Sequence, residues 1–139
     1  MAFLINDTKD GAPGPWEYLE ASALGACKVG MALTLTDGKL AKATATVRPS
    51  YISMFEGTVV AGDRIPVIRV LPDMIWETAA QAALTSIKLG DKVTLHTDGM
   101  QVTATKTNGV AEVVDMDGTN VGSRVLVRFN APATVVQQG

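Results

Sequence analysis

The sequence predicts an all-β fold, a small β-sandwich or β-barrel built from two related hairpin-led units, with an extended N-terminal arm and at most one short helix. Two observations lead to this prediction. One phrase recurs along the chain at a fixed distance, and missing such a repeat would give the wrong fold. Short β-prone runs are also joined by Asp-Gly or Asn-Gly dipeptides, which are the strongest local signal of a β-hairpin.

The repeat has an offset of sixty residues. "GMALTLTDGKLAKATAT" begins at Gly30, and "GDKVTLHTDGMQVTAT" begins at Gly90. Further along, "GDRIPVIRV" from Gly62 aligns with "GSRVLVRF" from Gly122 at the same offset. Because the matches occur in the same order in both copies, each copy is expected to build the same arrangement of strands.

Turn residues and β-prone runs place the strands. Asp37-Gly38 and Asp98-Gly99 each separate two β-prone runs and predict type I′ turns, in which both central residues need positive φ. "VAEVVDM" and "SRVLVRF" predict two later strands. Pro66 has no N–H to give to a ladder, so it predicts an edge strand or a bulge. "DMIWETAAQAALTSI", from Asp73, is the one helix candidate, although a strand followed by a loop fits it better.

These signals divide the chain into two parts. Residues 1–28 form an N-terminal arm and lead-in segment, in which "NDTKDGAPGP" is rich in turn residues. Residues 29–139 form the β domain. Its repeat-like halves are about 30–89 and 90–129, followed by a short C-terminal tail. The opening "MAFLINDTKD" has no basic residue before its short apolar run, so we do not expect a secretory signal.

The composition limits the partners. The chain has 139 residues, of which 47% are hydrophobic and 19% charged, enough for a packed core. Its net charge is −2 and its lysines and arginines are not clustered, so no nucleic-acid partner is expected. No segment approaches the roughly 20 apolar residues of a membrane helix, so no membrane partner is expected either. The single cysteine excludes a disulfide within the chain.

Groups suited to chemistry are scarce. His96 is the only histidine and lies within a predicted strand. Cys27 has small and apolar neighbours, which is typical of an inert buried cysteine. "DMDGTN" from Asp115 resembles the start of a calcium loop, but Asn120 replaces the required glycine and Leu126 the required glutamate. We therefore expect no enzyme activity, no metal and no cofactor.

The apolar residues of the N-terminal segment are the candidate contact residues. They are Phe3, Leu4, Ile5, Trp16 and Tyr18. An arm of this composition suits addition of a strand to a partner's sheet. For Trp16 and Tyr18 a place in the core is an equally good interpretation, because such large side chains usually bury much of their surface.

Four phrases resemble a known family: "DGKLAKATATVRPSYISM", "AGDRIPVIRVLPDMIWET", "LGDKVTLHTDGMQVTATKTNGVAEVVDMDG" and "GSRVLVRF". Over about residues 16–129 the chain resembles head decoration proteins of tailed phages and prophages of Gram-positive bacteria. The resemblance implies a β-rich structural protein, made in the host cytoplasm, that binds the outer surface of the mature capsid and stabilises it. It also implies the major capsid protein as partner and a homo-oligomer, commonly a trimer. The doubling departs from the simplest family pattern and leaves the topology open.

Two other functions compete with this one. A carbohydrate-binding or adhesion module predicts a row of exposed aromatic side chains on a monomer, with a thermal shift on adding sugar. A small hydrolase would have to use His96, and its test is loss of a hydrolytic activity in His96→Ala.

Overall fold

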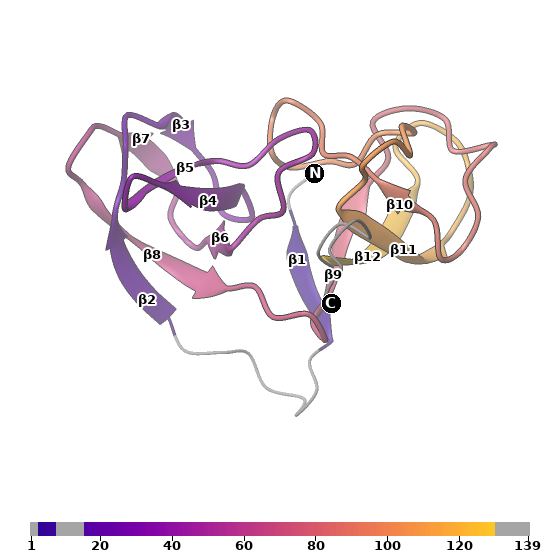
Figure 1. Cartoon of the computed structure of the whole chain (residues 1–139), viewed down its shortest axis with the longest axis horizontal. Helices are drawn as coiled ribbons and strands as arrows, with labels where there is room; N and C mark the ends of the chain where they lie inside the picture. The colour runs from indigo at the N-terminus through magenta and orange to yellow at the C-terminus, as the bar shows by residue number, and fades with distance from the viewer. Residues whose placement is uncertain (1–2, 8–15, 130–139) are drawn as a thin grey trace, which may run out of the picture.

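The computed structural model describes residues 3–7 and 16–129, and that part of the chain is all-β without a helix (Figure 1). From the N-terminus the strands are β1 (Leu4–Asp7), β2 (Trp16–Glu20), β3 (Gly25–Cys27), β4 (Ala32–Thr36), β5 (Lys39–Lys42), β6 (Tyr51–Ser53), β7 (Gly57–Val59), β8 (Arg64–Arg69), β9 (Ile75–Ala79), β10 (Lys92–Val93), β11 (Ala111–Met116) and β12 (Arg124–Phe129).

The strands form three antiparallel sheets. One five-stranded sheet has the order β2-β8-β6-β4-β5, the other the order β1-β9-β12-β11-β10, and β3 pairs with β7 in a two-stranded ribbon. In Figure 1 the first sheet and the ribbon lie on the left as the first unit, and the second sheet lies on the right as the second unit. The arrangement is that of a small β-sandwich. Isolated parallel bridges, Ala21 to Leu40 and Ala80 to Val102, bring the ends of each curled sheet together without closing a barrel.

The sequence repeat is also a structural repeat. Gly30 N–H donates to Ser53 O, and Gly90 N–H donates to Val113 O, both at 2.8 Å. The four repeat glycines have φ of 92°, 94°, 94° and 88° at Gly30, Gly62, Gly90 and Gly122. β2, β8, β6 and β4 of the first unit therefore correspond to β9, β12, β11 and β10 of the second.

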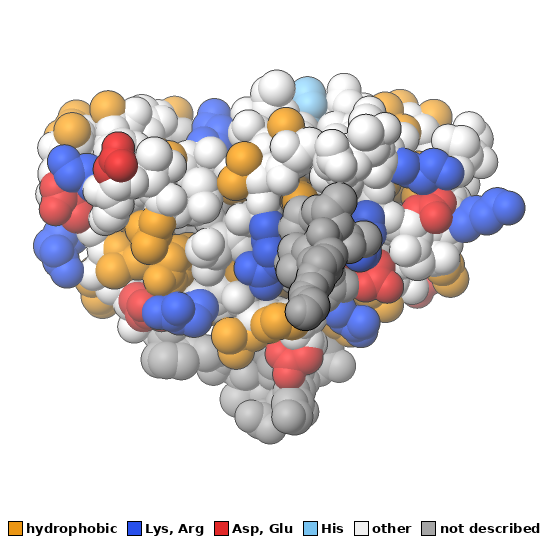
Figure 2. Space-filling view, viewed as in Figure 1, with side chains coloured by type: hydrophobic (Ala, Val, Ile, Leu, Met, Phe, Trp, Pro, Cys, Tyr) orange, Lys and Arg blue, Asp and Glu red, His pale blue; other side chains and the backbone are white. Residues whose placement is uncertain are grey.

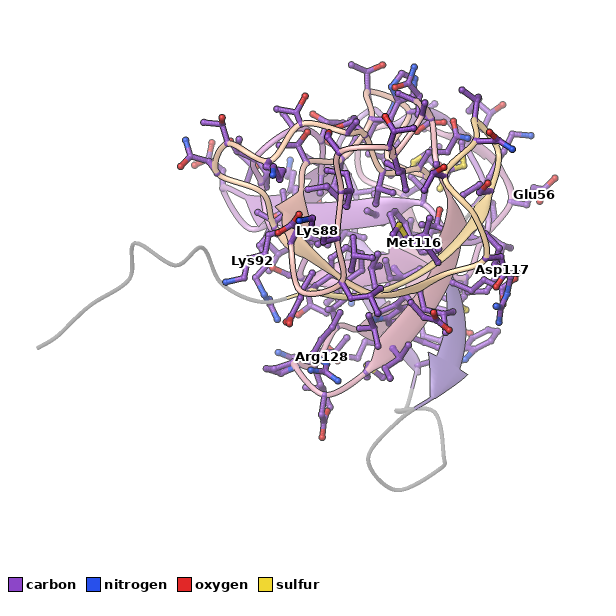
Figure 3. All side chains as sticks on the ribbon, turned by 90° about the vertical axis from the view of Figure 1, so that its right-hand side faces the viewer. Glu56, Lys88, Lys92, Met116, Asp117 and Arg128 are labelled. Carbon is purple, nitrogen blue, oxygen red and sulfur yellow. The ribbon has the colours of Figure 1, made fainter. Side chains whose placement is uncertain are left out.

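One row of side chains differs between the two copies. On β4, β6 and β8 the row is Ala32, Ile52 and Ile68. On β10, β11 and β12 it is Lys92, Glu112 and Arg128. The apolar row is no more than 3% exposed and belongs to the same core cluster as the interior of the second unit. The charged row is half-buried, and Figure 3 labels two of its members. Only the first unit therefore offers an apolar face on which another unit can dock.

Backbone hydrogen bonds also join the two units. Ala32 N–H donates to Gly99 O at 2.8 Å, and Ala45 and Leu95 exchange two hydrogen bonds of 3.0 Å each. The Arg48 side chain donates from Nε to Phe129 O at 3.2 Å. Burial lowers the pKa of Arg48, because desolvation disfavours its charged form.

β1 belongs to the core, and this corrects the expectation for Phe3. β1 pairs with β9 at the end of the second sheet, and Phe3 is fully buried. Its ring meets that of Phe129 edge-on, with centroids 5.0 Å apart, and Trp76 lies beside Phe129 at 6.4 Å. Phe3 N–H also donates to Gly30 O of the first unit at 2.9 Å. Phe3 is thus unavailable to a partner while β1 is in place, and residues 8–15 of the N-terminal segment predicted over 1–28 lie outside the described residues.

The first unit begins earlier than the expected boundary at residue 28. β2 and β3 both pair within it, with β8 and β7 respectively. Because Ala21 and Ala80 make equivalent hydrogen bonds to the residues before β8 and β12, the repeat extends back to β2 and β9. A sequence comparison limited to the glycine-led phrases misses this part, since β2 and β9 share little beyond their β propensity.

The predicted turns have different outcomes. Asp37 and Gly38 have φ of 53° and 79° and join β4 to β5 as a two-residue loop, which confirms the type I′ prediction. The prediction for Asp98-Gly99 is wrong, because the loop there spans four residues closed by a hydrogen bond from His96 N–H to Gln101 O. That loop packs on the first unit, where a Cβ on Gly99 would lie 2.9 Å from Lys42 Cγ. The predicted strands within 111–116, 124–129 and 75–79 are confirmed.

Replacing Phe3 by alanine tests the place of β1. We expect Phe3→Ala to lower the free energy of unfolding by about 3 kcal/mol, since it leaves a cavity against Phe129 and Trp76. Leu4→Ala is the matched control, because Leu4 is 45% exposed and should cost less than about 0.5 kcal/mol. Chemical denaturation measures both values. Equal, small losses would mean that β1 is not part of the folded core.

Candidate functional site

The outer edge of the first sheet carries two exposed aromatic side chains. Trp16 and Tyr18 of β2 are 56% and 57% exposed. Leu19, in contrast, packs against the core of the first unit. Successive side chains of a strand point to opposite faces, so Trp16 and Tyr18 share one face. Trp16 lies opposite Ile68, and Tyr18 opposite Pro66. In Figure 2 hydrophobic side chains gather over the first unit, bordered by charged ones.

The position of Pro66 shows where the backbone N–H and C=O of Tyr18 point. β8 is an interior strand with a continuous ladder to β2, so the expectation of an edge or a bulge at Pro66 is wrong. Pro66 O accepts a hydrogen bond from Met54 N–H at 2.9 Å, just beyond the end of β6, so Pro66 faces β6. Residues opposite each other in a non-hydrogen-bonded antiparallel pair both turn their N–H and C=O away from the partner. The N–H and C=O of Tyr18 therefore point to the outer edge of β2.

Two arginines flank this edge. Arg64 donates from Nη2 to the outward carbonyl of Tyr18 at 2.9 Å. Arg69 forms two hydrogen bonds with the Glu17 carboxylate, each 3.1 Å long, and its guanidinium lies 5.3 Å from the centre of the Tyr51 ring. The hydrogen bonds to Glu17 are the main cause of a raised pKa at Arg69, and the negative charge of Glu17 adds to it. The guanidinium thus keeps its charge, and it lies against Tyr51 of the first core.

The five predicted contact residues do not form one site. The structure brings Trp16 and Tyr18 together on β2. Leu4 is 45% exposed but lies on β1 in the other sheet. Phe3 is in the core, and Ile5 pairs through its backbone with Trp76 while its side chain lies outside the described residues. The surface that remains, the aromatic edge, consists of Trp16, Tyr18 and Pro66.

Glu17, Arg64 and Arg69 are site residues that the sequence analysis missed. Glu17 and Arg69 are 52 positions apart, and only the pairing of β2 with β8 places one beside the other. Their one available signal was the alternation in "WEYLE", which puts an acidic residue between two aromatic ones. Such a pattern does not identify its partner on another strand.

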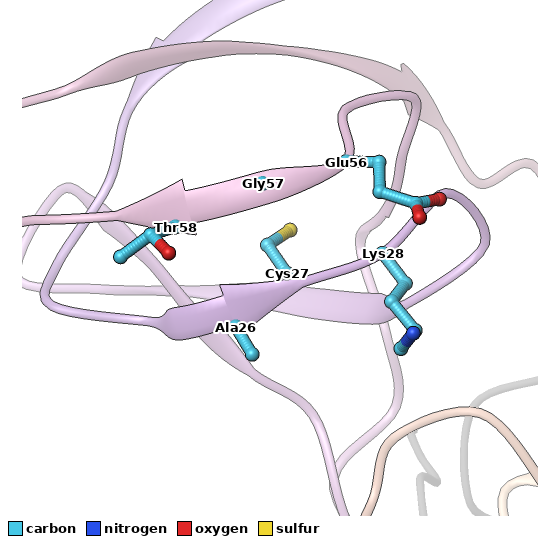
Figure 4. Close-up of a pocket in the computed structure, with 6 residues that line it drawn as sticks. All are labelled: Ala26, Cys27, Lys28, Glu56, Gly57 and Thr58. Carbon is cyan, nitrogen blue, oxygen red and sulfur yellow. The ribbon is translucent and has the colours of Figure 1, made fainter.

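A shallow hollow of ≈ 230 Å³ lies beside the ribbon (Figure 4). Its lining is Ala26, Cys27, Lys28, Glu56, Gly57 and Thr58. Cys27 is 2% exposed, and its Sγ lies 3.3 Å from Ser53 Oγ, within hydrogen-bond distance. The thiol is therefore engaged inside the first core, and the hollow presents mainly backbone and the exposed side chains of Lys28 and Glu56.

Other sequence candidates lie apart from the aromatic edge. His96 is half-buried in the second unit, and Asp115 is exposed on β11, where the ladder to β12 shifts its register. Within residues 3–7 and 16–129 no group of three or more His, Cys, Asp or Glu side chains is placed to hold a metal ion. The same ranges contain no helix long and apolar enough to span a membrane.

Comparison with known protein families, with curated proteins and with solved structures gives no match for this chain. The site is therefore interpreted from its own geometry.

The two tryptophans should report the exposure of the aromatic edge. In Trp76→Phe the remaining Trp16 should emit at long wavelength and be readily quenched by iodide. In Trp16→Phe the remaining Trp76, which is fully buried, should emit at short wavelength and resist quenching. Fluorescence of the two folded variants measures this difference. A protected Trp16 in the isolated protein would contradict the open edge.

Proposed function

We propose that this chain is a structural protein of a phage virion that binds the outer surface of the mature capsid and stabilises it, with the major capsid protein as its partner. The aromatic edge of β2 is the contact surface. The chain acts as a homo-oligomer, a trimer in this proposal, on the virion exterior. The resemblance of four long phrases to head decoration proteins supports the class of protein, and the aromatic edge supports the place of contact.

The observation that carries the proposal is the exposure of Trp16 and Tyr18 on an edge strand. Large aromatic side chains are enriched at the energetic centres of protein interfaces. A monomer in solution normally protects a hydrophobic edge strand with charge, prolines or a covering segment. Here two rings more than half exposed stand beside Pro66, and Arg64 donates a hydrogen bond to the edge backbone. Such an edge is typical of a surface that is covered in an assembly.

The junction of the two units suits a protein that bears load. The apolar row of the first unit is buried under the second, and hydrogen bonds from Phe3, Ala32 and Arg48 cross between them. A decoration protein of this construction would transmit force through one continuous core instead of a hinge. The row of the second unit that corresponds to it is charged and half-buried, so it offers no matching apolar face.

A carbohydrate-binding module is the second candidate function, and the same two rings favour it. Sugars stack on exposed aromatic faces, and Trp16 and Tyr18 are neighbours on one face of β2. This alternative predicts a monomer whose melting temperature rises with a sugar ligand. It gives no role to the outward backbone groups of β2.

Cosedimentation with capsids tests the proposal directly. The purified protein should bind saturably to expanded, undecorated heads from the same source and not to unexpanded proheads. The number of copies bound at saturation reports the symmetry of the site. Absence of binding to either particle would overturn the proposal, and a glycan array with the same protein would then decide for or against the alternative.

Loss of the two rings should weaken binding to heads. We expect the double variant Trp16→Ala, Tyr18→Ala to raise the Kd for expanded heads by at least tenfold, a loss of about 1.4 kcal/mol. Leu89→Ala and Val121→Ala are matched controls, since both are exposed loop residues of the second unit, at 60% and 68%. Each control should bind like the wild type. Unchanged binding of the double variant would place the contact elsewhere on the protein.

A further inference from the structure

We propose that the outer edge of β2 is a strand-acceptor site, which takes an extended segment of the partner protein as an added antiparallel strand. The segment carries an acidic or amide side chain at the position that Phe3 occupies in the second unit. With respect to the partner, this inference rests on the proposed function. The acceptor edge itself rests on the comparison of β2 with β9 in the repeat.

The second unit shows what such an edge holds. β9 corresponds to β2, and its outer edge is paired with β1, with Leu4 opposite Glu77 and Ile5 opposite Trp76. Glu77 and Tyr18 hold equivalent positions, because each is the third residue of its strand. In both units the next outward contact along the strand is a parallel bridge, at Ala80 or Ala21. The stretch of edge open for pairing is therefore the same in the two copies.

In the first unit this edge is vacant among the described residues. Within residues 3–7 and 16–129 β2 forms a ladder only with β8, and the N–H and C=O of Tyr18 point outward, as shown by Pro66 on the opposite side. Trp16 stands two residues earlier and so has the same orientation. Arg64 Nη2 donates to the carbonyl of Tyr18, and no strand of the described part of the chain pairs with the Tyr18 N–H. A segment added here would gain ladder hydrogen bonds and a leucine-like contact on the Tyr18 ring.

The chain's own β1 does not match the first unit, and the mismatch defines the chemistry of the ligand. On the second unit Phe3 packs against Phe129, with Trp76 beside it. The repeat places Arg69 where Phe129 stands and Glu17 where Trp76 stands. An aromatic side chain would have to desolvate that ion pair, whereas a side chain with an acceptor oxygen can bind the Arg69 guanidinium. β1 therefore selects β9, and β2 selects a strand with a polar side chain at that position.

The first test uses the isolated protein and two synthetic peptides. One has the sequence of residues 2–8, and the other is the same peptide with Phe3→Glu. At millimolar concentration the Phe3→Glu peptide should shift the amide NMR signals of Trp16 and Tyr18 and slow the hydrogen exchange of Tyr18. The unchanged peptide should shift them at least fivefold less at equal concentration. No shift at β2 with either peptide, or equal shifts with both, would overturn the inference.

Two variants at one position separate backbone pairing from the aromatic contact. Tyr18→Pro removes the ring and the outward N–H, while Tyr18→Thr removes the ring alone. The N–H of Tyr18 is not used in the ladder to β8, so Tyr18→Pro should fold, and its NMR spectrum checks this. The Phe3→Glu peptide should bind Tyr18→Thr at least tenfold more tightly than Tyr18→Pro. Equal affinity would exclude strand addition.

The same pair of variants, measured on expanded heads, connects the acceptor edge with the partner. Wild-type binding to heads with a tenfold loss in Tyr18→Pro relative to Tyr18→Thr supports both the strand acceptor and the capsid partner. Wild-type binding with equal losses in the two variants keeps the proposed function and rejects strand addition. Absence of wild-type binding rejects the proposed function, and the peptide experiment then decides the acceptor site separately.

Discussion

The structure depends on the burial of one apolar row, Ala32, Ile52 and Ile68, beneath the second unit. On the face that carries this row, the first sheet packs against the second unit. On its other face it packs against the core of the first unit. A sheet buried on both faces needs apolar residues at successive positions, and β4, β6 and β8 supply them. The loop at Gly99 and the side chain of Arg48 then lock the junction through hydrogen bonds. Without this row the two halves would be separate units of about sixty residues, a size at which a domain is only marginally stable.

The two units share one arrangement of strands but differ in the row of side chains between them and at the open end of each core. The docking row is apolar in the first copy and charged in the second, and among the described residues only the apolar row belongs to a core cluster shared with another unit. At the open end of each core the first copy has an ion pair, Glu17 with Arg69, and the second an aromatic pair, Trp76 with Phe129. The added strand β1 goes to the aromatic pair because Phe3 matches it. In our proposal the same difference lets the β2 edge accept another strand.

A structural role on a capsid and an acceptor edge on β2 fit the same features. Capture of a segment through backbone hydrogen bonds tolerates variation in the partner's side chains. The two aromatic rings would add affinity on one face of the captured strand, and Arg69 would add selectivity on the other. The rings, the backbone N–H and the Arg69 charge are different chemical groups. Substitutions can therefore measure the contribution of each to binding separately.

Much of the architecture follows from local sequence. The all-β class, the sixty-residue repeat and the Asp37-Gly38 hairpin rest on short-range chemistry, namely β propensity and the positive φ that a tight turn requires. Contacts between distant segments follow from register and packing instead. The sequence did not reveal that Phe3 is core and Trp16 is surface, since both are aromatic residues in a turn-rich segment; the pairing of β1 with β9 buries one, and the end of the first sheet exposes the other. The Glu17–Arg69 pair and the longer loop at Gly99 arise in the same way, because each depends on a neighbour many residues away.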